Sequence, residues 1–179
     1  MSLFRIHSAE MSRRVQSCML LAIMLLSAIA TANEIATAYE TVRVVVLKRQ
    51  HKLLLLSGEK IIRTYAVALG GGGLSPKMRQ GDHRTPEGLY QIDYRNSASS
   101  FHRALHISYP NEADRERARR LGASPGGNIM IHGITNGLGW VGASHRLSDW
   151  TDGCIAVTNA EIEEIWSLVP DGTSVEIRP

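Results

Sequence analysis

Cysteine is scarce in this sequence, with two such residues in a chain of 179. One of them, Cys18, lies in an N-terminal apolar stretch that we expect to be removed on export, which leaves Cys154 alone. A lone cysteine in an oxidising compartment cannot form an internal disulfide, and this excludes a disulfide-stabilised scaffold. Cys154 is then a buried residue without a chemical role, a partner in an intermolecular disulfide or a reactive thiol.

Long hydrophobic runs are also missing from the sequence. The longest run, residues 18–30 (CMLLAIMLLSAIA), has thirteen residues, whereas about 20 are usual for crossing a bilayer. Arg13 and Arg14 precede this run and the small residues Ala30-Thr31-Ala32 end it, a pattern typical of a cleaved secretory signal. An uncleaved membrane anchor is the alternative.

This pattern divides the chain into three parts. We predict a signal peptide over residues 1–32, which starts at Met1 or at Met11, a short linker over 33–40 and a single domain over 41–178. Six prolines and 44% hydrophobic residues fit one compact domain with a proper core. We therefore expect an exported protein of the periplasm, without stable membrane insertion after cleavage.

No charge of one sign dominates the chain. Lysine and arginine number 20, against 17 aspartate and glutamate. The leader would remove Arg5, Arg13, Arg14 and Glu10, which leaves 17 basic against 16 acidic residues over 33–179. A balance this close to zero gives no reason to expect nucleic acid as a partner.

Short β-branched and apolar segments separated by turns make up most of the predicted domain. We expect strands over residues 41–48, 53–56, 61–69, 89–94, 104–109, 128–131 and 173–177. One helix should run from Pro110-Asn111 to Leu121, and a second should begin with a capping box formed by Thr158 and Glu161. These elements predict a mostly β fold with a few short helices.

Two further patterns resemble ligand sites only superficially. The glycine run at 70–73 lacks the Gly-Lys-Ser/Thr of a phosphate loop, so we expect a flexible loop there. His102 and His106 have a spacing that suits zinc on a helix. Their segment looks extended, however, which would place them about 13 Å apart. We therefore predict neither a metal ion nor a cofactor.

His132 and Gly133 follow a short predicted strand. A histidine in this place is a structural residue by default, but Gly133 allows a sharp turn through which a nearby carbonyl can accept a proton from one ring nitrogen. That bond would fix the tautomer and direct the other nitrogen toward Cys154. Such an imidazole can hold the sulfur as thiolate and later protonate a leaving group.

Cys154 follows Thr151-Asp152-Gly153 on a turn between two ordered elements. Gly153 allows the amides around the sulfur to point inward as an oxyanion hole, which acyl transfer requires. The segment 134–150 is long and glycine-rich, and we expect it to lack regular structure and to serve function. The Cys154 and His132 pair therefore predicts a cysteine acyl-transfer enzyme.

In these segments the chain resembles the L,D-transpeptidases of the YkuD domain type. The resemblance covers residues 41–178, including Gly81-Asp82 to Gly88, His132-Gly133, and Thr151-x-Gly153-Cys154 with Asn159 downstream. It implies a β-sandwich or barrel-like domain with Cys154 and His132 in a catalytic cleft, and peptidoglycan stem peptides as substrate. It also implies that the Gly133 carbonyl orients His132.

Three departures separate this chain from the family pattern. Asp152 replaces the usual histidine, Ala156 replaces the arginine that commonly follows the Cys-Ile pair, and the interval from His132 to Cys154 is 22 residues, a few longer than usual. The longer interval suggests a larger loop over the cleft, and the substrate carboxylate must be met by another group, for which Arg146, His145 and Arg84 are candidates. The residues expected to contact the substrate or the oxyanion are Gly153, Thr151, Asp152, Arg146, His145, Arg84 and Trp140.

The resemblance implies a monomeric L,D-transpeptidase that forms peptidoglycan cross-links by acyl transfer between stem peptides. Two alternatives remain open. A hydrolase of the same fold would trim stem peptides or detach proteins from the wall. A wall-binding module with a degenerate site would account for the changes at Asp152 and Ala156.

Overall fold

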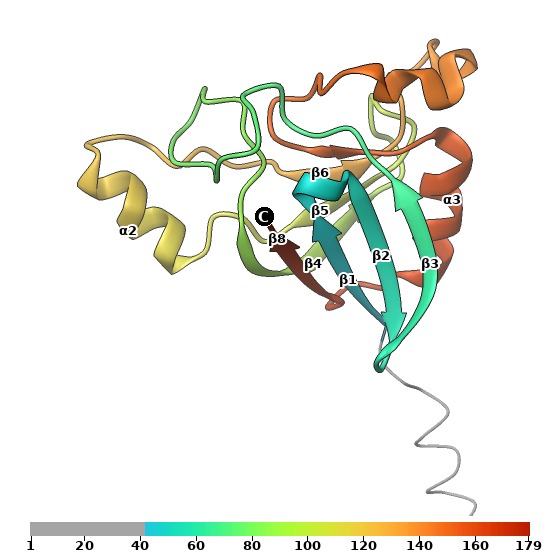
Figure 1. The fold of residues 1–179 in the computed structure, drawn as a ribbon, viewed down its shortest axis with the longest axis horizontal. Coiled ribbons are helices and arrows are strands. Elements are labelled where there is room, and N and C mark those ends of the chain that lie inside the picture. The colour runs from blue at the N-terminus through green and yellow to red at the C-terminus, as the bar shows by residue number, and fades with distance from the viewer. Residues whose placement is uncertain (1–41) are drawn as a thin grey trace, which may run out of the picture. The chain divides into compact units, whose positions relative to one another are not determined.

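The computed structural model describes residues 42–179, and its main element is a sheet of eight strands (Figure 1). The strands lie side by side in the order β3-β2-β1-β8-β4-β5-β6-β7. Their bounds are β1 Val42–Leu47, β2 Lys52–Ser57, β3 Lys60–Ala66, β4 Gly88–Asn96, β5 Ala104–Ile107, β6 Met130–His132, β7 Ile155–Ala156 and β8 Ser174–Arg178. The prediction of a mostly β fold is confirmed.

Helices in the described part of the chain are short. They are the α-helices α2, Glu112–Arg120, and α3, Asn159–Leu168, and the 3-10 helices η1, Lys48–Gln50, and η2, Gly139–Leu147. Figure 1 shows α2 and α3 at opposite sides of the view. Residues 42–179 contain no helix that is long and apolar enough to cross a membrane. The predicted leader and linker lie outside the described residues.

The two α-helices begin where the sequence predicted. Asn111 caps α2 by accepting a hydrogen bond from the Asp114 N–H, and the Asp114 carboxylate accepts one from the Asn111 N–H in return. Thr158 and Glu161 form the same reciprocal pair at the start of α3. A cap of this kind contributes about 1 kcal/mol. The cap of α3 fixes the direction in which the chain leaves β7, the strand that begins directly after Cys154.

Several predicted segments differ in the structure. The strand expected over residues 104–109 ends at Ile107, and the one expected over 128–131 begins at Met130 and ends at His132. The strand expected over residues 61–69 ends at Ala66, because the chain then leaves β2 and crosses toward β7. The segment 134–150, expected to lack regular structure, contains η2, with a kink at Gly142 where φ is 53° and ψ is −135°. A glycine is suited to that kink because it has no Cβ.

The two edges of the sheet approach each other and give it a barrel-like curl. Ala68, which follows β3, exchanges two backbone hydrogen bonds with Ala156 of β7, with N to O distances of 3.0 and 2.9 Å. The Thr151 N–H donates to the Leu69 carbonyl at 3.1 Å. These bonds satisfy edge groups that an open sheet would leave unpaired. The expected sandwich or barrel-like domain is confirmed.

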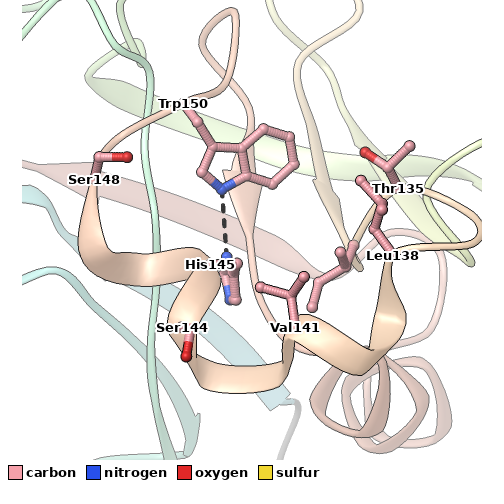
Figure 2. Close-up of a pocket in the computed structure, with 8 residues that line it drawn as sticks. Thr135, Leu138, Val141, Ser144, His145, Ser148 and Trp150 are labelled. Atoms are coloured by element: carbon pink, nitrogen blue, oxygen red, sulfur yellow. Dashed lines mark hydrogen bonds between the residues drawn. The ribbon is translucent and has the colours of Figure 1, made fainter.

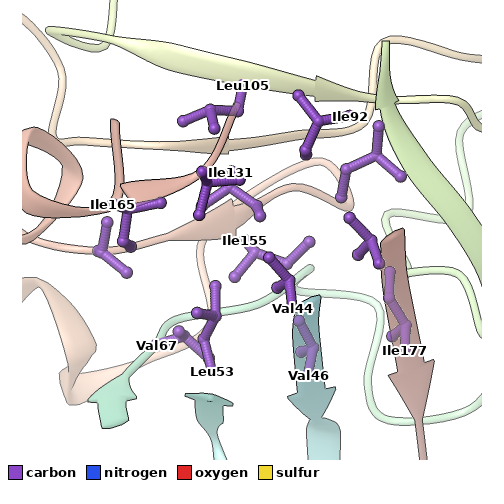
Figure 3. Close-up of a cluster of buried hydrophobic side chains, with 14 of the residues drawn as sticks. Val44, Val46, Leu53, Val67, Ile92, Leu105, Ile131, Ile155, Ile165 and Ile177 are labelled. Carbon is purple, nitrogen blue, oxygen red and sulfur yellow. The ribbon is translucent and has the colours of Figure 1, made fainter. Parts of the chain in front are cut away.

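The hydrophobic core lies inside this curl (Figure 3). Val44 and Val46 of β1 point inward because alternate residues of a strand share a face. Ile131 of β6 and Ile155 of β7 enter from the other end of the sheet, and Ile165 of α3 covers them. Each such side chain stabilises the fold by about 1.5–3 kcal/mol when fully buried. The strands that precede the candidate active site are therefore held rigidly.

Candidate active site

β6 and β7 are parallel neighbours that bring His132 and Cys154 onto one face of the sheet. Ile131 pairs with Ile155 and His132 pairs with Ala156, which lies two residues after Cys154. Because side chains alternate along a strand, His132 and Cys154 share one face while Ile131 and Ile155 point into the core. Within residues 42–179 the imidazole and the sulfur hydrogen-bond to other groups, and no hydrogen bond joins them.

Gly133 sets the orientation of the His132 ring, as the sequence predicted. The Nδ1 atom lies 2.7 Å from the Gly133 carbonyl oxygen, so Nδ1 donates and Nε2 keeps its lone pair. The ring is 3% exposed and packs against Phe101 and Trp150, with ring centroids 4.5 and 5.8 Å away. Burial lowers the pKa of His132, and the hydrogen bond to Gly133 opposes that shift only in part. At neutral pH the imidazole is therefore a neutral base.

The Cys154 thiol is also neutral at rest. Its Sγ atom donates to the Asn128 carbonyl oxygen at 3.5 Å. Burial raises the pKa of this thiol, and the Asp152 carboxylate adds to that effect; a hydrogen bond from the Met130 N–H and the Lys77 ammonium work against it. Burial thus disfavours the thiolate that His132 is expected to hold, and that expectation stays a prediction for the attacking state.

The turn before Cys154 is held by Thr151. Its hydroxyl donates to the Cys154 carbonyl at 2.8 Å and accepts the Gly153 N–H at 3.2 Å. Gly153 has a φ of 120°, and a Cβ there would lie 2.6 Å from the Arg84 carbonyl oxygen, so only glycine fits. The expectation that the amides around the sulfur form an oxyanion hole stays a prediction, and the Gly153 N–H already donates to Thr151. The Cys154 N–H, which has no acceptor within residues 42–179, is the remaining donor.

The three residues predicted to replace the missing arginine are engaged elsewhere. Arg146 forms an ion pair with Glu161 at the start of α3. His145 is buried, and its Nδ1 accepts the Trp150 indole N–H at 3.3 Å. Arg84 donates its Nε to the Gly72 carbonyl at 3.0 Å. These contacts tie all three side chains to the protein itself.

Trp140 and Ala156 differ in exposure. The Trp140 side chain on η2 is 83% exposed, so it lies on the outer surface. Ala156, where the family commonly has arginine, is fully buried beside Ala68. A long charged side chain at position 156 would therefore have to leave the space that the curled sheet closes here.

One pocket is lined by Trp150, the ring that packs against the His132 imidazole (Figure 2). This imidazole-side pocket has a volume of about 290 Å³, and η2 forms one of its walls. Its lining is mainly apolar, from Ile134, Leu138, Val141 and Trp150. Trp150 is also the ring that packs edge-on against His132. The long segment after Gly133 thus builds a cavity that Trp150 links to the candidate base.

A second pocket borders the thiol. This thiol-side pocket has a volume of about 310 Å³ and shares no residue with the imidazole-side pocket. Its polar lining comes from Lys77, Gln80, His83, Asn128 and Asp152. Asn128 supplies the carbonyl that accepts the thiol proton and so links this pocket to the sulfur.

Of the residues that line the thiol-side pocket, the sequence predicted Asp152 but missed Lys77, Gln80, His83 and Asn128. His83 and Asn128 have positive φ angles of 54° and 56°, which residues other than glycine rarely adopt and which often mark functional sites. No local pattern in the sequence signals this, because two loops far apart in the chain meet only through the fold.

The two histidines considered for zinc have protein partners instead. His102 Nε2 lies 2.8 Å from the Glu163 carboxylate, and His106 Nδ1 lies 2.5 Å from that of Asp93. Within residues 42–179, no group of three or more histidine, cysteine, aspartate or glutamate side chains is arranged to hold a metal ion.

The curled sheet places a histidine, fixed by its neighbour's carbonyl, at the end of β6 and a cysteine directly before the parallel strand β7, an arrangement that fits a cysteine-dependent acyl-transfer domain. Comparison with protein families agrees. The model of the L,D-transpeptidase catalytic domain, YkuD, matches residues 41–177, and the chain belongs to this family.

Individual relatives are similar over much of this chain. YafK of Escherichia coli (strain K12), itself only provisionally assigned as an L,D-transpeptidase, is 32% identical over 127 residues, which are 68% of this chain and 44% of YafK. The structure of the helical cell shape determining protein Pgp2 from Campylobacter jejuni has a TM-score of 0.56 at 23% identity and covers 77% of this chain and 47% of Pgp2. Bd1075 of Bdellovibrio bacteriovorus has a TM-score of 0.55 at 28% identity, with 79% and 49% covered. The chain thus spans about half the length of these relatives.

Proposed function

We propose that this protein is a peptidoglycan L,D-transpeptidase in which Cys154 is the nucleophile and His132 the general base and acid. The observation that carries the proposal is that His132 ends β6 and Cys154 directly precedes the parallel strand β7, with His132 Nδ1 fixed by Gly133. This bond leaves Nε2 as the only ring atom that can accept a proton. Family membership gives the class of substrate.

The first half of the reaction begins from the neutral pair. The thiol leaves the Asn128 carbonyl, and His132 Nε2 takes its proton as the sulfur attacks the carbonyl that precedes a terminal D-amino acid of a stem peptide. The Cys154 N–H donates to the developing oxyanion. The carbon–nitrogen bond then breaks, the leaving amine takes the proton from His132, and an acyl-enzyme remains.

The second half reverses these roles. The amine of a diaminopimelate residue in a second stem peptide attacks the thioester while His132 accepts its proton. The carbon–sulfur bond breaks, the thiolate is reprotonated by His132, and a cross-link between two stems results. Water in place of the amine would give the hydrolase considered above. The burial of His132 against Phe101 and Trp150 limits access of water to the base and favours transfer.

The remaining features of the proposal follow from the sequence. A leader over residues 1–32 would deliver the domain at 41–178 to the periplasm, where stem peptides are accessible. We propose that the enzyme acts there as a monomer without a cofactor, since the chemistry needs only Cys154, His132 and amide donors.

Incubation with purified tetrapeptide muropeptides tests the proposal, with products identified by mass. Transpeptidation predicts cross-linked dimers with loss of a D-amino acid, whereas a hydrolase would accumulate shortened monomers. The Cys154→Ala variant should give neither product, and thermal unfolding would confirm that it is folded. Full turnover by this variant would defeat the proposal. A wild-type thiol that fails to react with a carbapenem-type acylating agent would favour the wall-binding module.

A further inference from the structure

The thiol-side pocket is polar, in contrast to the imidazole-side pocket, and its charges determine what it can bind. Lys77 is 4% exposed and pairs with Asp82 at 2.7 Å. Burial opposes ionisation of Asp82, but hydrogen bonds from Lys77 and from three backbone N–H groups outweigh it and lower its pKa to about 2. Lys77 and Asp82 thus form a buried salt bridge whose opposite charges offset each other. It holds the loop in place without adding net charge to the pocket.

Asp152 also lines this pocket, and its carboxylate forms no salt bridge with a lysine or arginine of residues 42–179. Its side chain is 89% exposed, and one oxygen lies 2.6 Å from His83 Nδ1. The other oxygen has no hydrogen-bond donor within residues 42–179. His83 therefore orients the carboxylate and leaves one oxygen directed to a ligand.

The position of Asp152 relates it to the reacting sulfur. It lies two residues before Cys154, and its negative charge raises the pKa of the Cys154 thiol. It also shares the pocket with Asn128, whose carbonyl accepts the thiol proton. A group bound by Asp152 would thus lie close to the acylated sulfur. An aspartate in place of the histidine of the family pattern gives the pocket a negative charge.

We propose that the thiol-side pocket binds a primary ammonium group of the stem peptide through Asp152, with His83 as the positioning residue. This inference rests on the proposed function and assigns the chemistry of one subsite. A carboxylate that accepts charge-assisted hydrogen bonds discriminates an ammonium from an uncharged amide. The Gln80 side-chain amide lines the same pocket and can accept a further N–H.

Two ammonium groups of the reaction fit this subsite. One belongs to the diaminopimelate side chain of the acyl donor, which is attached next to the carbonyl that Cys154 attacks. The other is the diaminopimelate ammonium of the acceptor, which must approach the thioester. Both groups are primary ammonium ions. They can be distinguished because the donor takes part in acylation of Cys154 and the acceptor in the transfer that follows.

Binding to the full chain carrying Cys154→Ala tests the proposal without requiring turnover. The probes are a tetrapeptide stem with diaminopimelate at its third position and the same peptide acetylated on the side-chain amine, compared by calorimetry. We expect the native peptide to bind about tenfold more tightly than the acetylated one. Adding Asp152→Asn, which keeps the shape but removes the charge, should abolish that difference.

The control variant is Glu59→Gln in the turn between β2 and β3. It removes a carboxylate that is 97% exposed, similar to the 89% of Asp152. It should keep the tenfold preference. The proposal would be overturned if the Cys154→Ala protein, which retains Asp152, bound both peptides equally. It would also be overturned if the preference survived Asp152→Asn, or if neither peptide showed saturable binding. Acylation of Cys154 does not enter this binding assay. A failure of the ammonium proposal can therefore be distinguished from a failure of the proposed function.

Kinetics with the protein that retains Cys154 distinguish whether the donor or the acceptor stem supplies the ammonium group. If the donor supplies it, acetylation slows acylation of Cys154 by about tenfold, and Asp152→Asn removes that effect. If the acceptor supplies it, both peptides acylate Cys154 equally fast, and Asp152→Asn slows only the transfer to a second stem. An Asp152→Asn variant that matches the wild-type protein in both steps would contradict the proposal.

Discussion

At the scale of single residues, burial decides the protonation of the candidate catalytic pair. It lowers the pKa of His132 below its usual 6.5 and raises that of Cys154 above its usual 9.0. Both shifts act in the same direction, since each opposes the charged form. The neutral pair therefore predominates between these two values, and proton transfer accompanies attack.

Ultraviolet difference spectra of the thiolate test this state. The wild-type protein minus Cys154→Ala should show no thiolate absorbance at neutral pH and should gain it only above pH 9.0. A pH–rate profile would not suffice, because the neutral pair and a thiolate–imidazolium pair carry the same number of protons. Thiolate absorbance at neutral pH that disappears in His132→Gln would contradict the neutral pair.

Gly153 offers a second test at the residue scale. A Cβ there would lie 2.6 Å from the Arg84 carbonyl oxygen, and its φ of 120° disfavours any other residue. We expect Gly153→Ala to lower the free energy of unfolding by about 3 kcal/mol and to slow acylation of Cys154. Urea unfolding measures the first effect and adduct mass the second.

Gly137→Ala is the matched control for this substitution. Its φ is 85°, also positive, but a Cβ there meets nothing within 4 Å. It should cost only about 1 kcal/mol, from backbone strain alone. Equal losses for the two variants would show that the close approach of Arg84 contributes nothing.

At the scale of elements, the start of α3 depends on its capping box. Thr158 accepts the Glu161 N–H, and Glu161 accepts the Thr158 N–H while also pairing with Arg146 of η2. Thr158→Ala should lower the free energy of unfolding by about 1 kcal/mol, measured by urea denaturation. Thr158→Ser keeps the hydroxyl and should retain most of that stability. A Ser variant as unstable as the Ala variant would count against the cap.

The same scale separates what the sequence predicts from what it does not. The capping boxes, the β-branched strands and the His132-Gly133 bond depend on neighbouring residues, so their patterns are readable in the chain. The engagement of Arg146 with Glu161 depends on contacts across the fold, and so does the use of the Gly153 N–H by Thr151. η2 was missed because its short helical turns are interrupted by a kink at Gly142, and the glycines of this segment suggested a loop.

At the scale of the whole molecule, the curl of the sheet brings the chain after β3 against β7. Asp149 supports this closure with one carboxylate oxygen 2.7 Å from the Leu69 N–H nitrogen and the other 3.0 Å from His51 Nε2. The Thr151 N–H binds Leu69 from the same side. The turn that carries Cys154 is therefore fixed by the segment that follows β3.

Asp149→Ala should weaken both the fold and the site. It leaves the Leu69 N–H without its acceptor, which costs about 1–3 kcal/mol for a buried donor. We expect a lower free energy of unfolding in urea together with slower acylation of Cys154. Asp149→Asn, which retains an oxygen for Leu69, is the control and should lose less. Unchanged stability in the Ala variant would contradict a role in closure.

The most direct test of the account is the mass of the intact wild-type protein after brief incubation with a tetrapeptide stem. We predict one covalent adduct equal to the stem without its terminal D-amino acid, carried by Cys154 and absent from Cys154→Ala and His132→Gln. A wild-type protein that stays unmodified while product forms, or an adduct on any other residue, would contradict the assignment of Cys154 as nucleophile.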